Sequence, residues 1–244
     1  MKAAIFSDLH LNAQDPKKTS TFAAILRKLR DEKITELWLL GDIFDLLVGP
    51  FAFWQQAHAE VFSELKKLSQ AGVHVLWCEG NHDFHIKHLE KELGLGIFDD
   101  QKSLVIEGRQ ILLAHGDLVD ANDHSYLKWR ATTRNPCLQR LISLTPTWVA
   151  EKFLKPWAEG LSAKSRGRHE PDETRLRALY RQNADQLFAK KFTAVFMGHC
   201  HVFDLYVNGE SFYLNLGSWL EPTWRYAIWE PQQTSLPVVN LVNP

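Results

Sequence analysis

Short apolar runs alternate with longer amphipathic stretches through the first hundred residues. The runs at 3–7, 36–40 and 73–79 have the length and composition of buried strands. Between them, the stretches 18–31 and 52–70 carry apolar residues at the spacing of a helix face. Because strands and helices alternate along the chain, we expect an α/β fold in which helices cover the faces of a sheet.

The strand pattern continues after this first part but is interrupted once. Two more apolar runs lie within 103–116, and the strand-like pattern is then absent over 121–190. Strands resume between 193 and 242 in an order that indicates a β-meander, with Asn208-Gly209 typical of a hairpin turn. A chain of 244 residues, 45% of them hydrophobic, can form one large domain. We therefore expect a single domain over 1–244 that carries a helical insertion at 121–190.

Charge and cysteine content limit the partners and the compartment. The chain has 28 Lys and Arg against 29 Asp and Glu, so it lacks the positive excess of a general nucleic-acid binder. Its three cysteines form no CxxC pair, which favours a reducing compartment over a disulfide framework. The apolar run before Asp8 is too short for a signal peptide, and no run reaches the ~20 residues that span a bilayer. We expect a cytoplasmic protein without a transmembrane segment.

Side chains that can ligate metals follow five of the predicted strands. The carboxyl edge of an open α/β sheet is where ligands bind, so we expect these side chains to converge. In chain order they are Asp8 and His10; Asp42 and Asp45; Asn81, His82 and Asp83; His115 and Asp117; and His199 and His201. Carboxylate, amide and imidazole groups together are typical of sites for divalent ions such as Mn²⁺, Fe²⁺ or Zn²⁺. One ion would leave ligands unused, so we expect two.

Local spacing favours the same interpretation. One residue separates Asp8 from His10 and His199 from His201, so both members of each pair can point to the same side of an extended chain. Cys200 then points the other way, and we expect it to be a packed thiol. Glycines next to the ligands let the backbone turn tightly or approach closely; they are Gly41, Gly80, Gly116 and Gly198.

The ordered motifs resemble those of a known enzyme family. They are Asp8-x-His10, Gly41-Asp-x-x-Asp45, Gly80-Asn-His-Asp83, His115-Gly-Asp117 and Gly198-His-x-His201. This set is similar to that of the calcineurin-like metallophosphoesterases. The resemblance implies a hydrolase with a four-layer α/β/β/α sandwich, in which two metal ions clamp a phosphoryl group. Mn²⁺ is the expected ion, with Fe²⁺ and Zn²⁺ as alternatives.

The same resemblance assigns a role to each position. The first ion is held by Asp8, His10, Asp42 and His201, and the second by Asp42, Asn81, His115 and His199. His82 is expected to contact or protonate the reacting phosphoryl group, with Asp83 orienting it. The alternative for His82 is a supporting hydrogen bond. Asp45 and Asp117 are expected to support the ligands or form turns.

The insertion contains an aromatic helix. Thr145 and Pro146 have the character of an N-cap and a first helical residue, and Val149, Phe153 and Trp157 then recur four residues apart. Basic residues border this helix; they are Lys152, Lys155, Lys164, Arg166 and Arg168. Two interpretations remain open. The segment is either a helical hairpin packed on the core, or a lid whose apolar groove and cationic rim take a ligand with acyl chains and phosphates from an anionic membrane surface.

A closer resemblance concerns the substrate. The stretches 115–139, 162–166 and 213–219 are similar to the UDP-2,3-diacylglucosamine hydrolases of lipid A biosynthesis. Those enzymes cleave the pyrophosphate of a UDP-lipid to give UMP and 2,3-diacylglucosamine 1-phosphate. The implied partner is a nucleotide-lipid, met by a peripheral protein at the inner-membrane surface. The implied substrate contacts are Asp123, Tyr126, Arg130, Arg134, Asn135, Lys164, Ser165 and Arg166.

One motif departs from that pattern. Many of those hydrolases carry Gly-Asn-Arg-Asp, whereas this chain has His82 in place of the arginine. A phosphodiesterase or phosphatase that acts on a soluble nucleotide or another phosphoester is therefore the alternative. A non-catalytic scaffold on the same fold is the third hypothesis, and the intact set of ligand positions argues against it.

Overall fold

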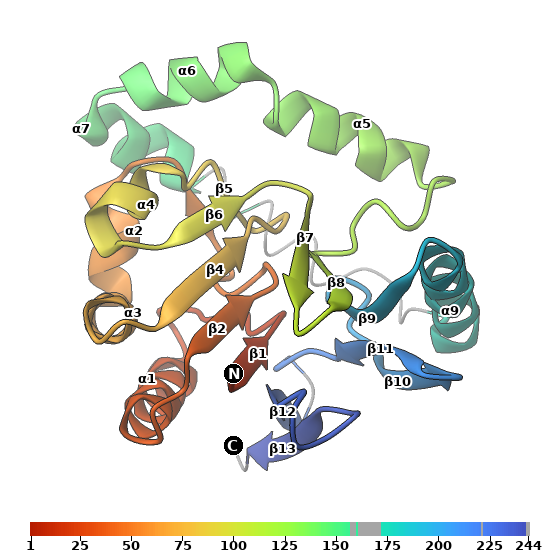
Figure 1. The fold of residues 1–244 in the computed structure, drawn as a ribbon. Coiled ribbons are helices and arrows are strands. Elements are labelled where there is room, and N and C mark those ends of the chain that lie inside the picture. Colours follow the sequence, from red (N-terminus) through yellow and green to blue (C-terminus); the bar gives the residue numbers. More distant parts are fainter. Residues whose placement is uncertain (157–159, 161–171, 221, 243–244) are drawn as a thin grey trace.

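Two β-sheets form the centre of the molecule (Figure 1). The computed structural model describes residues 1–156, 160, 172–220 and 222–242. The first sheet has the strand order β13-β12-β1-β2-β4-β6, with parallel pairing from β1 to β6 and antiparallel pairing of β12 and β13. Its strands are β1 (Ala3–Phe6), β2 (Glu36–Leu39), β4 (His74–Cys78), β6 (Gly96–Phe98), β12 (Trp224–Trp229) and β13 (Val238–Val242).

The second sheet has the order β10-β11-β9-β8-β7. Its pairs β8–β9 and β9–β11 are parallel, and the two outer pairs are antiparallel hairpins. Its strands are β7 (Gln101–Ile106), β8 (Arg109–Ala114), β9 (Phe192–Met197), β10 (Phe203–Asn208) and β11 (Ser211–Leu216).

Side chains of the first sheet alternate between two buried faces. In β1, Ala3 and Ile5 belong to the core between the two sheets, whereas Ala4 and Phe6 belong to the core on the opposite face. All four are fully buried, as expected for a strand covered on both sides. The core between the sheets is aromatic; its largest side chains are Trp38, Phe196, Phe212 and Trp229.

Helices cover the outer faces of both sheets. α1 (Pro16–Asp31) and α3 (Ala59–Gln70) lie against the first sheet, and α9 (Glu173–Ala189) lies against the second (Figure 1). Buried leucines such as Leu26 and Leu65 hold these layers together, each contributing about 1.5–3 kcal/mol of transfer free energy. The order helix, sheet, sheet, helix confirms the predicted four-layer sandwich.

Two predicted boundaries differ in detail. The helix expected at 18–31 begins at Pro16, because Asp15 caps it by accepting a hydrogen bond from the Lys18 N–H at 3.2 Å. The single helix expected at 52–70 is two helices, α2 (Ala52–Ala57) and α3. They separate at His58, which leaves the helical region with φ −129° and packs its ring 4.7 Å from Phe44.

The prediction of a β-meander at the end of the chain is wrong. β10 and β11 do form a hairpin at Asn208-Gly209, but β11 lies between β9 and β10. β12 then crosses to the first sheet and pairs with β1. Burial explains this crossing, because Ala227 and Trp229 of β12 complete the aromatic core between the sheets.

A helical arm passes over the carboxyl ends of the strands (Figure 1). We use "the arm" for residues 124–154, which comprise α5 (His124–Thr133), α6 (Pro136–Leu144), α7 (Thr147–Val149) and the π-helical turn η1 (Ala150–Leu154). The helix predicted to start with Thr145 as its N-cap instead has Pro146 there, one residue later. α9 also falls within the predicted insertion, yet it forms the outer layer of the sandwich.

Short elements connect the loops at this edge. The two-stranded sheet of β3 (Leu47–Val48) and β5 (Asp83–Phe84) joins the loop after β2 to the loop after β4. α4 (His88–Leu93) follows β5. Within the part of the chain that the structure describes, no helix is both long enough and apolar enough to cross a membrane.

Candidate metal centre

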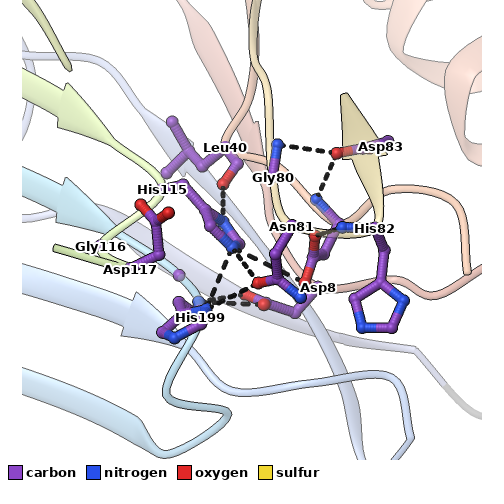
Figure 2. Close-up of polar contacts among 12 residues, drawn as sticks. Asp8, Leu40, Gly80, Asn81, His82, Asp83, His115, Gly116, Asp117 and His199 are labelled. Atoms are coloured by element: carbon purple, nitrogen blue, oxygen red, sulfur yellow. Dashed lines mark hydrogen bonds and ion pairs between the residues drawn. The ribbon is translucent and has the colours of Figure 1, made fainter. Parts of the chain in front are cut away.

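Polar side chains from five strand ends meet at one place (Figure 2). Ligand atoms of Asp8, His10, Asp42 and His201 lie within 4.8 Å of one another. Those of Asp42, His115 and His199 form a second group by the same measure. The convergence expected from the sequence is therefore present, and Asp42 belongs to both groups.

The first group joins the ends of β1, β2 and β9. His10 Nε2 lies 3.0 Å from His201 Nε2 and 4.0 Å from Asp42 Oδ2. His201 Nε2 is in turn 3.4 Å from Asp8 Oδ1. Two imidazoles and two carboxylates thus face a common centre.

The second group adds the loop after β4. His115 Nε2 lies 3.6 Å from Asp42 Oδ2 and 3.2 Å from His199 Nδ1. The amide oxygen of Asn81 lies 3.1 Å from His115 Nε2 and 2.9 Å from His199 Nδ1 (Figure 2). Asn81 therefore completes a set of four donors around a second centre.

Separations between the donor atoms fit a shared cation. Two donors about 2.1 Å from one ion and about 90–110° apart are separated by about 3.0–3.4 Å. The pair His10–His201 at 3.0 Å and the pair His115–His199 at 3.2 Å both fall in this range. A donor set of carboxylates, an amide and neutral imidazoles suits divalent ions of the Mn²⁺, Fe²⁺ and Zn²⁺ type.

A backbone carbonyl fixes the tautomer of His115. Its Nδ1–H donates to the Leu40 oxygen at 2.8 Å, and a carbonyl can only accept (Figure 2). The lone pair is then on Nε2, the atom that faces Asp42, Asn81 and His199. This arrangement is the usual way in which a protein orients a metal-binding histidine.

The backbone at the candidate ligands is strained. Five of them have positive φ angles in the left-handed region, which is uncommon for residues other than glycine. Hydrogen bonds hold this conformation; for example, the Asp8 N–H donates to Gly41 O and the His10 N–H to Asp42 O. Such strain gathers at functional sites. The five residues are Asp8 (54°), His10 (47°), Asp42 (53°), His199 (70°) and His201 (59°).

Two positions must be glycine, because atoms of neighbouring ligand residues lie too close to leave room for a Cβ. A Cβ on Gly80 would lie 2.4 Å from the backbone nitrogen of Asp42 and 2.2 Å from its Oδ1. A Cβ on Gly198 would lie 2.4 Å from Asp8 Oδ2. The expectation that glycines beside the ligands permit close packing is confirmed at these positions.

The charged side chains of the two donor groups affect one another's pKa values. Burial alone would raise the pKa of Asp42, but His115, His82 and His10 together hold it well below its usual range. Burial opposes the charged form of His115, yet Asp42 and other carboxylates raise its pKa to about 8. Burial lowers the pKa of His199 to about 4, and His115 adds to this effect. The Asp42 carboxylate thus stabilises the protonated form of His115.

Comparison with known proteins identifies the family. The family model described as calcineurin-like phosphoesterase matches residues 1–203. The chain belongs to this family. Together with the two donor groups, this membership makes the protein a metal-dependent phosphoesterase.

Several similar proteins are named for a more specific activity than that of the family as a whole. A UDP-2,3-diacylglucosamine hydrolase from Serratia proteamaculans is 30% identical over 227 residues, which cover 90% of this chain and 91% of the relative. A UDP-2,3-diacylglucosamine hydrolase from Vibrio cholerae is 32% identical over 159 residues, and the match spans 64% of each chain. Among solved structures, an archaeal phosphodiesterase aligns with a TM-score of 0.52 at 14% identity, over 99% of this chain and 100% of that one.

The prediction that Asp83 orients His82 is wrong. The Asp83 carboxylate instead accepts hydrogen bonds from three backbone N–H groups, those of Asp42, Ile43 and Gly80, at 2.7–2.9 Å. Its role is to hold the loops after β2 and β4 together. His82 Nδ1–H donates to the backbone oxygen of Asp45 at 2.8 Å.

His82 lies at the border of the first donor group. Its ring is 5.0 Å from the His10 ring, edge to face, and its backbone N–H donates to Asp42 Oδ1 at 2.8 Å. The Asp45 carboxylate lies beside both histidines, with Oδ1 4.0 Å from His10 Nδ1 and 3.9 Å from His82 Nδ1. The prediction that Asp45 supports the ligands agrees with these contacts.

Helix α5 places two of the predicted substrate contacts against Asp117. The Tyr126 hydroxyl donates to Asp117 Oδ2 at 2.7 Å, and Arg130 Nε donates to the same oxygen at 2.5 Å. Arg130 also forms an ion pair with Asp100. The Tyr126 ring lies 5.2 Å from the ring of His199, so this tyrosine borders the metal centre.

The other predicted substrate contacts have different surroundings. Asp123 and Asn135 cap α5 and α6, accepting hydrogen bonds from the backbone N–H of Tyr126 and of Cys137 at 2.9 Å each. Arg134 forms an ion pair with the buried Glu79. Lys164, Ser165 and Arg166 lie outside the described residues.

Three supporting residues were missed by the sequence interpretation. They are Leu40, whose carbonyl orients His115, and the acids Glu79 and Asp100, which pair with Arg134 and Arg130. Leu40 and Glu79 directly follow β2 and β4, just before a ligand loop, and this position is the signal that could have indicated them.

Proposed function

We propose that this phosphoesterase hydrolyses the pyrophosphate bond of UDP-2,3-diacylglucosamine, giving UMP and 2,3-diacylglucosamine 1-phosphate. The observation that carries the proposal is the similarity to a hydrolase of that name along 90% of the chain. The two donor groups around Asp42 supply a centre suited to phosphoryl chemistry. On this proposal the protein acts in lipid A biosynthesis.

The proposed centre holds two divalent ions, with Mn²⁺ as the expected metal. Asp8, His10, Asp42 and His201 hold the first, and Asp42, Asn81, His115 and His199 hold the second. When bound, the ions act as Lewis acids on the phosphoryl oxygens. Because the ligands include only the carboxylates of Asp8 and Asp42, the chain leaves a formal positive surplus for an anionic substrate.

His82 is the proposed proton donor to the leaving group. Its Nδ1–H is committed to the Asp45 carbonyl, so Nε2 is the atom that can carry a proton to the substrate. Tyr126, held by Asp117 beside His199, borders the space for the phosphates.

The arm is the proposed contact for the acyl chains and the inner-membrane surface. Apolar side chains on α6, α7 and η1 are largely exposed; they are Leu141 (64%), Leu144 (72%), Trp148 (69%) and Phe153 (61%). Ala150, Ile142 and Leu154 pack on the core, so the arm is anchored on one side and presents this apolar face on the other. Lys152, whose ammonium lies 5.4 Å from the Phe153 ring, adds positive charge suited to anionic lipid. A peripheral protein in the cytoplasm would use this face.

Turnover of the lipid relative to its soluble counterpart tests this proposal. UDP-2,3-diacylglucosamine in detergent micelles and UDP-GlcNAc in the same detergent are compared with Mn²⁺ present. We expect kcat/KM to be much higher for the lipid, because each buried CH₂ of an acyl chain can contribute up to about 0.8 kcal/mol. Equal rates would reject the lipid substrate and favour a soluble nucleotide. If both fail while bis-p-nitrophenyl phosphate is hydrolysed, another phosphoester is the substrate.

A further inference from the structure

Arg134 lies where the arm meets the metal centre. It ends α5 as its C-cap residue and directly precedes Asn135, the N-cap of α6. Its side chain is 13% exposed and forms an ion pair with the Glu79 carboxylate, which is 2% exposed. The guanidinium also donates to the Gly80 carbonyl at 2.8 Å, and it lies 5.6 Å from the Phe84 ring.

These contacts surround one candidate ligand. Gly80 immediately precedes Asn81, whose amide oxygen faces His115 and His199 at 3.1 and 2.9 Å. Since the Gly80 carbonyl belongs to the peptide group that also contains the Asn81 nitrogen, Arg134 restrains that peptide plane directly.

Glu79 closes the same loop from its other end. One of its carboxylate oxygens pairs with Arg134, and the other accepts the Ile86 N–H at 2.8 Å. Residues 79–86 thus form a ring closed by a single side chain, and Arg134 holds that side chain in place.

A second contact ties α6 to this loop. His85 has φ 59°, and its Nε2 lies 2.9 Å from the Ser143 hydroxyl. That hydroxyl is also 3.0 Å from the Gln139 carbonyl, to which it donates, so it accepts from the His85 ring. The arm is therefore attached to the Asn81 loop at both helices.

We propose that Arg134 is a positioning residue, which sets the orientation of Asn81 toward the second metal by bridging Glu79 and the Gly80 carbonyl. This inference rests on the proposed function, because it takes Asn81 as a metal ligand. It replaces the expectation that Arg134 binds the substrate. The arm then forms a wall of the metal centre, in addition to carrying the exposed apolar face.

Mn²⁺ titration of purified variants tests this proposal. Arg134→Lys keeps the charge beside Glu79, but a lysine lacks the planar fork that reaches both Glu79 and Gly80. Arg134→Gln removes the charge as well. The matched controls are Arg140→Lys and Arg140→Gln, because Arg140 is an exposed arginine of α6. Binding is followed by the electron paramagnetic resonance signal of free Mn²⁺, at a temperature well below each melting temperature.

We expect both Arg134 variants to bind one of the two Mn²⁺ ions at least about tenfold more weakly, the scale for partners that orient a ligand. The Arg140 controls should match the wild type. Melting temperatures separate the alternatives, since a purely structural role would lower the melting temperature and leave both Mn²⁺ affinities unchanged. That result in Arg134→Lys would overturn the proposal, and Arg134→Lys carries the test if Arg134→Gln does not fold.

Asn81→Ala distinguishes failure of this inference from failure of the proposed centre. If Asn81→Ala loses one ion and Arg134→Lys does not, the positioning role is wrong and the ligand assignment stands. If Asn81→Ala keeps both affinities, the ligand assignment is wrong, and the positioning role is overturned with it.

Discussion

Gly80→Ala should disable the metal centre, because the added methyl group would overlap with Asp42. The added Cβ would lie 2.4 Å from the Asp42 backbone nitrogen, and contacts below 3.0 Å essentially never occur. The two loops must therefore separate by at least 0.6 Å, the difference between these values. Metal coordination tolerates about 0.2 Å, so Asp42 would be displaced too far to serve either ion. Overpacking of this kind costs about 1–3 kcal/mol of stability.

Metal analysis and a thermal melt measure both effects. For a chain of this size 1 kcal/mol corresponds to about 2–4 °C, so the melting temperature should fall by about 2–12 °C. Mn²⁺ content after gel filtration should fall from two ions per chain toward zero. Gly72→Ala is the control, because its φ of +86° strains alanine while no atom lies within 4 Å of the new Cβ. Two ions retained in Gly80→Ala, with wild-type activity, would refute the reasoning.

Three further changes address single residues. Asp42→Ala should lose both ions together, since Asp42 belongs to both donor groups; elemental analysis that finds two ions would contradict the shared ligand. Mn²⁺ affinity should rise about tenfold per pH unit up to pH 8 and then level off, because the proton that His115 holds below its pKa of about 8 must leave before Nε2 can ligate; calorimetric titrations showing no change between pH 6 and 8 would reject this coupling. His82→Ala should lower kcat by about 10²-fold or more with metal content unchanged, the usual scale for a positioned acid; an unchanged kcat would leave His82 with a supporting hydrogen bond.

Local sequence patterns predicted the helices and strands themselves better than they predicted which of these elements lie side by side. The strands at 3–7, 36–40 and 73–79 were recognisable because each buries both faces and is apolar along its length. The pairing of β11 with β9 was not, since it depends on which faces remain open once the sheets have assembled. The crossing of β12 to the first sheet has the same origin, because only the assembled core shows the space that Trp229 fills.

The convergence of the donor groups was predictable because each donor follows a strand, and parallel strands end at one edge. Contacts between particular side chains were harder to predict from the sequence. Asp83 does not orient His82, because its carboxylate accepts from the backbone N–H groups of Asp42, Ile43 and Gly80. The ion pair of Arg134 with Glu79 could not be predicted, since nothing in the sequence links these two residues across 55 positions.

Product analysis after incubation with UDP-2,3-diacylglucosamine and Mn²⁺ tests the central claim most directly. The account predicts that mass spectrometry finds UMP and 2,3-diacylglucosamine 1-phosphate in equal amounts, and that Asp42→Ala yields neither. Release of UDP with unphosphorylated diacylglucosamine would place the cleavage at the wrong bond. Intact substrate in the presence of a fully metal-loaded enzyme would contradict the assignment of this lipid as the substrate.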